Sequence, residues 1–167
     1  AEMSLRDNRM YWVFETFPLI EETSWVSLQD MDAYPTLRLE VVNNSTSKSC
    51  EVIADFDSGS NTTVLDESQL RDAEILASKP RSIKEAVHLG STFQYSRLPL
   101  SIRLADETNN RHTERLDCAV VYSWDHSPWT RINPGRQALA GRDLLLSLSA
   151  SVELDGKARK TYIRRVG

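Results

Sequence analysis

The chain has 167 residues, of which 40% are hydrophobic and 26% are charged, as in an ordinary globular domain with a core of its own. Its formal net charge of −4 argues against nucleic-acid binding, because proteins of that class carry a basic excess. No apolar stretch approaches the roughly 18 residues needed for a membrane span, so we expect no membrane segment, and the first residues lack the pattern of a signal peptide.

Residue types that bind metals or form disulfides are sparse. Cys50 and Cys118 are too few for a disulfide framework, and we expect two buried free thiols in a reducing compartment, which favours a cytoplasmic protein over a secreted one. His88, His112 and His126 stand far apart in the sequence, without the spacing of a zinc site. We therefore expect neither a metal nor another cofactor.

The first predicted element is an N-terminal extension, residues 1–33, rich in aromatic side chains. We expect one strand in it, over residues 11–17. The extension could act as an arm that packs on the domain, add a strand at a subunit interface, or be a pro-segment that occupies a cleft. The remaining chain, residues 34–167, is predicted to be one domain.

A β-hairpin is predicted next. Residues 37–42 largely alternate between apolar and polar side chains, which is the pattern of a half-buried strand. Turn-forming residues occupy positions 43–47, and residues 50–56 form a second strand. The hairpin therefore leads the chain directly to Asp57.

The middle of the chain mixes one helix with further strands. Residues 66–77 have mild helical spacing, with Asp66 as the cap and Lys79-Pro80 as the end of the helix. Two strands are predicted within residues 82–104.

The last third of the chain continues in short elements. We expect a polar turn at residues 106–112, a strand at 116–122, a long loop at 124–134, a short apolar run at 137–140, a helix at 144–148 and a final hairpin through Asp155-Gly156, between Val152 and Tyr162. Many short strands, turns at regular intervals and little helix predict a closed or sandwiched antiparallel β domain.

The most informative short segment is Asp57-Ser58-Gly59-Ser60. An acid at the end of an apolar strand enters a tight turn, and a β-branched run follows at once. An Asp-Ser-Gly turn alone is common, and a solvated surface turn is its ordinary explanation. Gly59 would let the backbone approach another group closely, and the small Ser60 would leave room for a bound chain.

A second segment downstream changes the interpretation of this turn. Gly141-Arg142-Asp143 follows an apolar run and precedes a run of leucines that begins with Leu144-Leu145. By itself it is the start of a helix with an acid in the first turn. Together and in this order, over roughly residues 35–150, the two segments resemble the catalytic loop and the Gly-Arg-Asp/Asn signature of retropepsin-like (retroviral-type) aspartic proteases.

The resemblance implies an all-β fold, a retropepsin-like closed β-barrel-type lobe with one short C-terminal helix. It implies that Asp57 is the catalytic carboxylate and that Ser58, Gly59, Ser60 and Arg142 support the active-site loop. The sequence holds no second Asp-Thr/Ser-Gly segment, so the resemblance also implies a homodimer in which two Asp57 carboxylates form one site. The implied activity is that of an aspartic endopeptidase, which acts on a polypeptide substrate.

The family also has a mobile hairpin, the flap, that closes over the substrate. Residues 82–97 hold that place here, which would bring His88, Leu89, Gly90 and Ser91 near a bound substrate. This stretch has one Gly where the viral flaps commonly have several.

Asp55 stands where the family usually has an apolar residue. By strand alternation Asp55 and Asp57 share a face, so Asp55 could line the cleft and favour a basic or polar substrate side chain. A solvent-facing carboxylate is the alternative. Asn61 replaces an acid that often pairs with the family Arg, which leaves open how Arg142 contacts the loop.

Two other functions stay open at this point. A non-catalytic interaction and dimerisation module could retain the same fold. An unrelated β-sandwich binding domain would require both segments to be coincidences. The intact Asp-Ser-Gly-Ser turn favours the enzyme.

Overall fold

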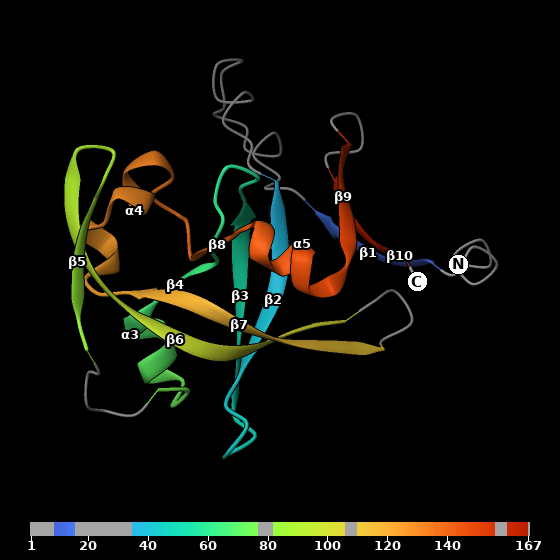
Figure 1. Cartoon of the computed structure of the whole chain (residues 1–167), viewed down its shortest axis with the longest axis horizontal. Coiled ribbons are helices and arrows are strands. Elements are labelled where there is room, and N and C mark those ends of the chain that lie inside the picture. Colours follow the sequence, from blue (N-terminus) through green and yellow to red (C-terminus); the bar gives the residue numbers. More distant parts are fainter. Residues whose placement is uncertain (1–8, 16–34, 77–81, 106–109, 156–159, 167) are drawn as a thin grey trace, which may run out of the picture.

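A closed β-barrel of six strands forms the centre of the molecule (Figure 1). The computed structural model describes residues 9–15, 35–76, 82–105, 110–155 and 160–166. Around the barrel the strands follow the order β2 (Thr36–Val42), β3 (Ser49–Phe56), β8 (Ala138–Ala140), β4 (Val64–Asp66), β7 (Arg111–Val121) and β6 (Ser91–Ala105), and β2 closes the barrel by pairing with β6. The short strand β5 (Lys84–His88) pairs with the first part of β6 and forms a hairpin with it.

The predicted β2–β3 hairpin and the two strands within residues 82–104 are confirmed. The prediction of an antiparallel domain is wrong in the middle of the barrel. There β8 lies between β3 and β4, parallel to β3 and antiparallel to β4, and β4 is parallel to β7. The late strand β8 thereby enters the sheet beside the strand that leads to Asp57.

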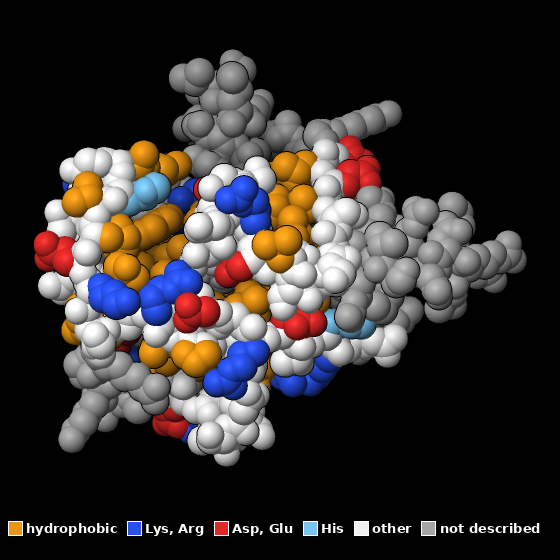
Figure 2. Space-filling model, in the orientation of Figure 1, with side chains coloured by type: hydrophobic (Ala, Val, Ile, Leu, Met, Phe, Trp, Pro, Cys, Tyr) orange, Lys and Arg blue, Asp and Glu red, His pale blue; other side chains and the backbone are white. Residues whose placement is uncertain are grey.

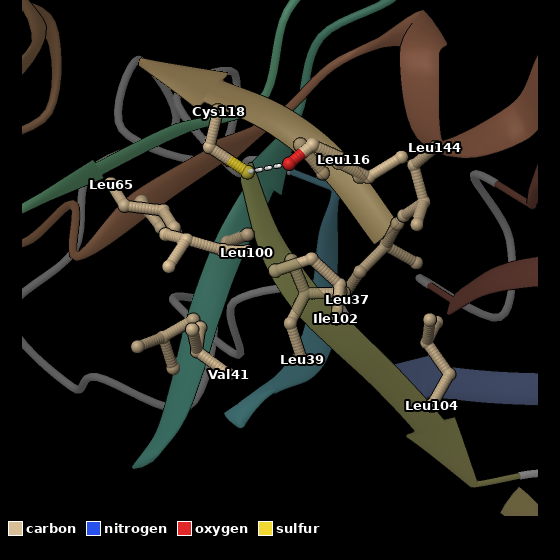
Figure 3. Close-up of a cluster of buried hydrophobic side chains, with 14 of the residues drawn as sticks. Leu37, Leu39, Val41, Leu65, Leu100, Ile102, Leu104, Leu116, Cys118 and Leu144 are labelled. Carbon is tan, nitrogen blue, oxygen red and sulfur yellow. Dashed lines mark hydrogen bonds between the residues drawn. The ribbon is translucent and has the colours of Figure 1, made fainter. Parts of the chain in front are cut away.

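Alternation along the strands builds the core (Figure 3). In β2 the side chains of Leu37, Leu39 and Val41 are buried while Arg38 is exposed, which confirms the period-two pattern. Cys118 is buried in the same core, where burial raises the pKa of its thiol to about 12. Cys50 and Cys118 are both free, as predicted, but only Cys118 is buried, and the prediction of burial is wrong for the half-buried Cys50.

An ion pair spans the strands that close the barrel. Glu40 of β2 and Arg103 of β6 are direct partners in the strand register. The Arg103 guanidinium donates to both Glu40 carboxylate oxygens, with Nε–Oε2 at 2.8 Å and Nη2–Oε1 at 2.5 Å. This bidentate pairing lowers the pKa of Glu40 to about 2.

A separate three-stranded sheet joins the two ends of the chain, in the order β1 (Arg9–Glu15), β10 (Lys160–Val166) and β9 (Ala150–Asp155). The strand predicted at residues 11–17 is therefore present over Arg9–Glu15, and it pairs antiparallel with β10 along its whole length. The predicted final hairpin is β9–β10, with residues 156–159 of its connection outside the described residues. The boundary between residues 33 and 34 stays a prediction.

Helix α3 (Glu67–Asp72) begins as predicted and ends earlier than predicted. The Asp66 side chain accepts a hydrogen bond from the backbone N–H of Ser68, which confirms the cap. At the other end, Glu74 has a φ of 58° and the Ile75 N–H bonds back to the Leu70 carbonyl. This left-handed cap ends the helix before Lys79-Pro80 is reached.

The other helical segments lie in the second half of the chain. Residues 124–134, predicted to be a loop, contain a 3₁₀ turn, Trp124–His126, and the helix α4 (Pro128–Ile132). A Pro at the first position of α4 favours the helix start. The predicted helix after Gly141 is present as α5 (Arg142–Leu148). None of the helices that the structure describes has the length and apolarity to cross a membrane.

The strand predicted at residues 116–122 is β7, which begins earlier, at Arg111, and so takes up part of the turn predicted at residues 106–112. Arg111 and His112, placed in a polar turn from the sequence, already belong to this strand. Residues 106–109 of that turn lie outside the described residues.

Candidate active site

Asp57 lies directly after β3, in a loop that the neighbouring strand holds by backbone contacts. Its N–H donates to the carbonyl of Ala140 in β8 at 3.0 Å. Its carboxylate is exposed and accepts a hydrogen bond from the backbone N–H of Gly59 at 2.8 Å. A Cβ at position 59 would lie 3.0 Å from the Asp57 Oδ1 atom, so a side chain there would crowd the carboxylate.

The chain after the turn is tied to itself and to the start of α5. Ser60 Oγ donates to the Thr62 carbonyl at 2.7 Å, and the Arg142 N–H donates to the Ser60 carbonyl at 2.8 Å. Gly141 approaches the same loop so closely that a Cβ would lie 2.6 Å from the Thr62 carbonyl oxygen. The two segments recognised in the sequence are therefore in backbone contact.

Asp143 makes the side-chain contacts between α5 and the loop. Its two carboxylate oxygens accept from the Thr63 backbone N–H at 2.9 Å and from the Thr63 hydroxyl at 2.8 Å. It also accepts from the N–H of Leu144, within the first turn of its own helix. Arg142, predicted to support the loop, reaches it through its main chain, while its side chain is exposed. Sequence reasoning missed the Asp143–Thr63 contact, although an acid at the helix start was a signal for a backbone N–H acceptor.

A cleft with a volume of about 600 Å³ opens beside this loop. It lies between the Asp57 loop, the inner side of the β5–β6 hairpin and α4. Figure 2 shows hydrophobic side chains gathered on the side of the molecule that carries the hairpin and α4, with basic side chains nearby. The apolar and aromatic side chains that line the cleft are Phe56, Val64, Ala86, Phe93, Tyr95, Ala119, Trp129, Ile132 and Leu139.

The predicted flap residues lie on the β5–β6 hairpin. His88 ends β5 and lines the cleft. Leu89 and Gly90 form the turn with φ angles of 50° and 74°, both positive as in a type I′ turn. Ser91 begins β6 and accepts a hydrogen bond from Arg131 of α4.

Asp55 lines the cleft with only 2% of its surface exposed, so it is not a solvent-facing carboxylate. Its Oδ2 atom accepts from Arg136 Nε at 2.7 Å and from Asn133 Nδ2 at 2.9 Å. The side chains of Asp55 and Arg136 are 3% and 7% exposed, which makes this a buried ion pair. The partner Arg136 could not be foreseen, because it lies 81 positions along the chain.

Asn61 and Arg97 also line the cleft. The Arg97 guanidinium donates to the hydroxyl of Thr62 at 3.1 Å and pairs with Asp117 of β7. Thr62 in turn donates to the Asn61 side chain. An arginine from β6 therefore contacts the loop near the position where the family usually has an acid. Within the described ranges, no three His, Cys, Asp or Glu side chains gather in a way that could hold a metal ion.

Comparison with known proteins bears on the fold. No protein-family model and no curated protein matches the sequence. Among solved structures, the chain is similar to the crystal structure of a retropepsin-like aspartic protease from Rickettsia conorii, with a TM-score of 0.52 and 11% sequence identity. The match covers 93% of this chain and 91% of that chain. The predicted fold, a retropepsin-like closed β-barrel, is thereby confirmed.

Proposed function

We propose that the protein is an aspartic endopeptidase whose active site forms across a homodimer. The observation that carries this proposal is the exposed Asp57 carboxylate, held by the Gly59 N–H at the edge of a cleft of about 600 Å³. A cleft of that size can take several side chains of an extended peptide.

The chemistry requires two carboxylates. When two such groups lie about 3 Å apart, both cannot ionise together, and they share one proton. The ionised member takes a proton from a water molecule, and the protonated member donates to the peptide carbonyl; the roles then reverse for the leaving nitrogen. One chain supplies a single Asp57, so the second carboxylate would come from the Asp57 of a second copy.

The described geometry suits a loop that must bring a carboxylate to a twofold axis. Backbone bonds to Ala140 and Arg142 and the contacts of Asp143 fix the path of the loop on both sides of the turn. Ser58 and Gly59 are exposed at the tip of that turn, where a second copy could approach. The pairing of Asp55 with Arg136 balances its charge, so we propose that Asp55 supports the cleft floor.

The decisive experiment compares the protein with an Asp57→Asn variant. The amide keeps the shape of the side chain and an oxygen that can accept from Gly59, so the fold should persist. We expect the unmodified protein to cleave an unfolded polypeptide between pH 3 and pH 7, and the variant to lose at least about 10³-fold in rate. Asp72→Asn, an exposed acid at the end of α3, is the matched control and should keep full activity.

Dimerisation adds a second test. Because the monomer would hold half a site, specific activity should fall when the protein is diluted below its dimer dissociation constant. A statine-type transition-state mimic should inhibit the enzyme and oppose that loss. Absence of cleavage by a demonstrably dimeric protein would instead favour the alternative, a non-catalytic interaction module with the same fold.

A further inference from the structure

The tip of the β5–β6 hairpin is held by α4 of the same chain. The ring of His88, at the end of β5, stacks on the ring of Trp129, with centroids 5.4 Å apart and planes within 14°. On the other strand, Ser91 accepts a hydrogen bond from Arg131. Both strands of the hairpin therefore touch one short helix, at residues two positions apart in that helix.

Trp129 is fixed from the other side. Trp124 stacks parallel to its buried side chain at 6.0 Å, and Phe93, which lies on β6 further from the hairpin tip, meets it edge-on at 4.6 Å. Such ring pairs favour one geometry over others. The hairpin tip is the opposite case, with Val87 and Leu89 exposed by 69% and 62%. The contact thus joins an exposed hairpin end to a buried anchor.

Hydrogen bonds also link the helix α4 to β3, the strand that leads to Asp57. Arg136 donates through Nη1 to the carbonyl of Trp129, and through Nε to Asp55, two residues before Asp57. The Trp124 indole N–H donates to the Arg136 carbonyl at 2.7 Å. Through Arg136, hydrogen bonds therefore connect α4, which contacts the hairpin, to β3, which leads to the candidate catalytic loop.

We propose that Trp129 is a positioning residue that, together with Arg131, holds the β5–β6 hairpin in a fixed position over the cleft, with His88, Ser91 and Phe93 as the contacts on the hairpin. We call this set of contacts the latch. His88, Trp129 and Asp57 all line this cleft, so the latch fixes the space between the hairpin and the candidate catalytic loop. A hairpin held in advance spares the ordering cost when a peptide binds. Residues 124–134 supply both Trp129 and Arg131, the two side chains that hold the hairpin.

The catalytic meaning of the latch rests on the proposed function, whereas the latch itself does not. The test therefore begins with hydrogen exchange of the hairpin amides, residues 84–95, in the full chain. A His88→Ala, Arg131→Ala double variant removes the two contacts at the hairpin tip and leaves the Phe93–Trp129 contact in place. It should speed the exchange of the tip amides roughly tenfold, because two side-chain contacts are lost. Both side chains are exposed, so the variant should fold.

Two further variants separate the latch from a general loosening. Val87→Ala removes an exposed side chain beside His88 that does not line the cleft, and it should leave hairpin exchange unchanged. His88→Phe retains a ring that can stack on Trp129, and it should restore slow exchange where His88→Ala does not. Equal exchange in the double variant and the unmodified protein would overturn the latch.

Peptide kinetics then test its role in the reaction. If the latched hairpin is the binding-competent state, the double variant should raise KM about threefold with kcat within twofold. A variant that merely lost folded enzyme would lower kcat and keep KM. Faster hairpin exchange in a protein that cleaves nothing would retain the latch and reject the protease, and unchanged exchange in an active protease would do the reverse.

Discussion

The two walls of the cleft are held by different kinds of contact. The Asp57 loop is fixed mainly through the backbone: Asp57, Ser60 and Thr63 all bond to β8 or to the start of α5 through main-chain groups. Apart from its strand pairing, the β5–β6 hairpin is fixed through side chains. The contacts are the His88–Trp129 stack, the Phe93–Trp129 ring contact and the Arg131–Ser91 bond.

This difference follows from what each wall would have to do. A carboxylate that shares a proton with a partner needs an accurate position, and backbone hydrogen bonds with a close glycine approach leave few alternative positions. A hairpin that admits a substrate needs contacts that break at a small cost in free energy. Single ring pairs and exposed hydrogen bonds each contribute only a small free energy. Substitutions in the loop, the barrel and the hairpin test whether the loop is rigid and the hairpin only weakly held.

The largest effect is expected where the backbone contact is tightest. In Gly141→Ala the new Cβ would lie 2.6 Å from the Thr62 carbonyl oxygen, and the main chain itself would have to move. We expect a loss of about 3 kcal/mol in the free energy of unfolding, measured by urea titration. Gly135→Ala is the matched control, since its Cβ would meet only Asn133 Oδ1, at 3.7 Å. A destabilisation no larger than that of the control would show that the loop can move to accommodate the new Cβ and is not rigid.

The second effect concerns the side chain that supports the loop. Asp143→Ala removes the acceptor of the buried Thr63 N–H and hydroxyl, and it should cost about 2 kcal/mol because the N–H loses its partner. Arg142→Ala removes an exposed side chain and should change stability by less than about 0.5 kcal/mol. Thermal unfolding of both variants compares them directly, and a larger loss for Arg142→Ala would reverse the assignment.

A third effect concerns the barrel that carries both walls. The pKa of Glu40 is lowered from the ordinary value of 4.5 to about 2, mainly by the hydrogen bonds from Arg103. The stabilising contribution of the ion pair is therefore complete above pH 4.5 and is lost as the pH falls towards 2. Arg103→Met should destabilise the protein by about 1–2 kcal/mol at pH 6, allowing for partial solvent exposure, and by nearly nothing at pH 2. At pH 3 to 4 part of the contribution remains, which would help keep the barrel closed at the acidity that a carboxylate dyad favours.

Urea titrations of both proteins from pH 2 to pH 7 measure this difference. Arg38→Met is the control, because Arg38 and Glu51 are each 64% exposed and their pair should contribute little at any pH. If the difference between Arg103→Met and the unmodified protein does not depend on pH, the ion pair is not what holds the β2–β6 contact.

The same division between backbone and side chains explains what the sequence could predict. Strand alternation in residues 37–42, the Asp66 cap and the two segments around Asp57 and Gly141 are local patterns, and the structure has them where expected. Their meeting across 80 or more positions came from the family resemblance, because one sequence alone contains no record of the parallel β3–β8 pairing.

The contacts that sequence reasoning missed are long-range side-chain pairs. Asp55 with Arg136, Asp143 with Thr63, and His88 with Trp129 each join separate elements. In residues 124–134 the sequence predicts a loop, because two prolines and two tryptophans within eleven positions show no helical period. The aromatic packing of Trp129 and the Pro128 helix start stabilise α4 there instead.

The smallest expected effect sharpens the hairpin side of the comparison. Leu89 adopts a φ of 50° in the turn, where a leucine is strained and asparagine is favoured before glycine. Its side chain is 62% exposed, so Leu89→Asn sacrifices little burial. We expect a gain of about 0.5 kcal/mol, seen as hairpin amide exchange slowed about twofold. Ile83→Asn, an exposed residue before β5, is the control without turn strain. Faster exchange in Leu89→Asn would mean that the leucine itself holds the tip, and that the latch on α4 is not its main support.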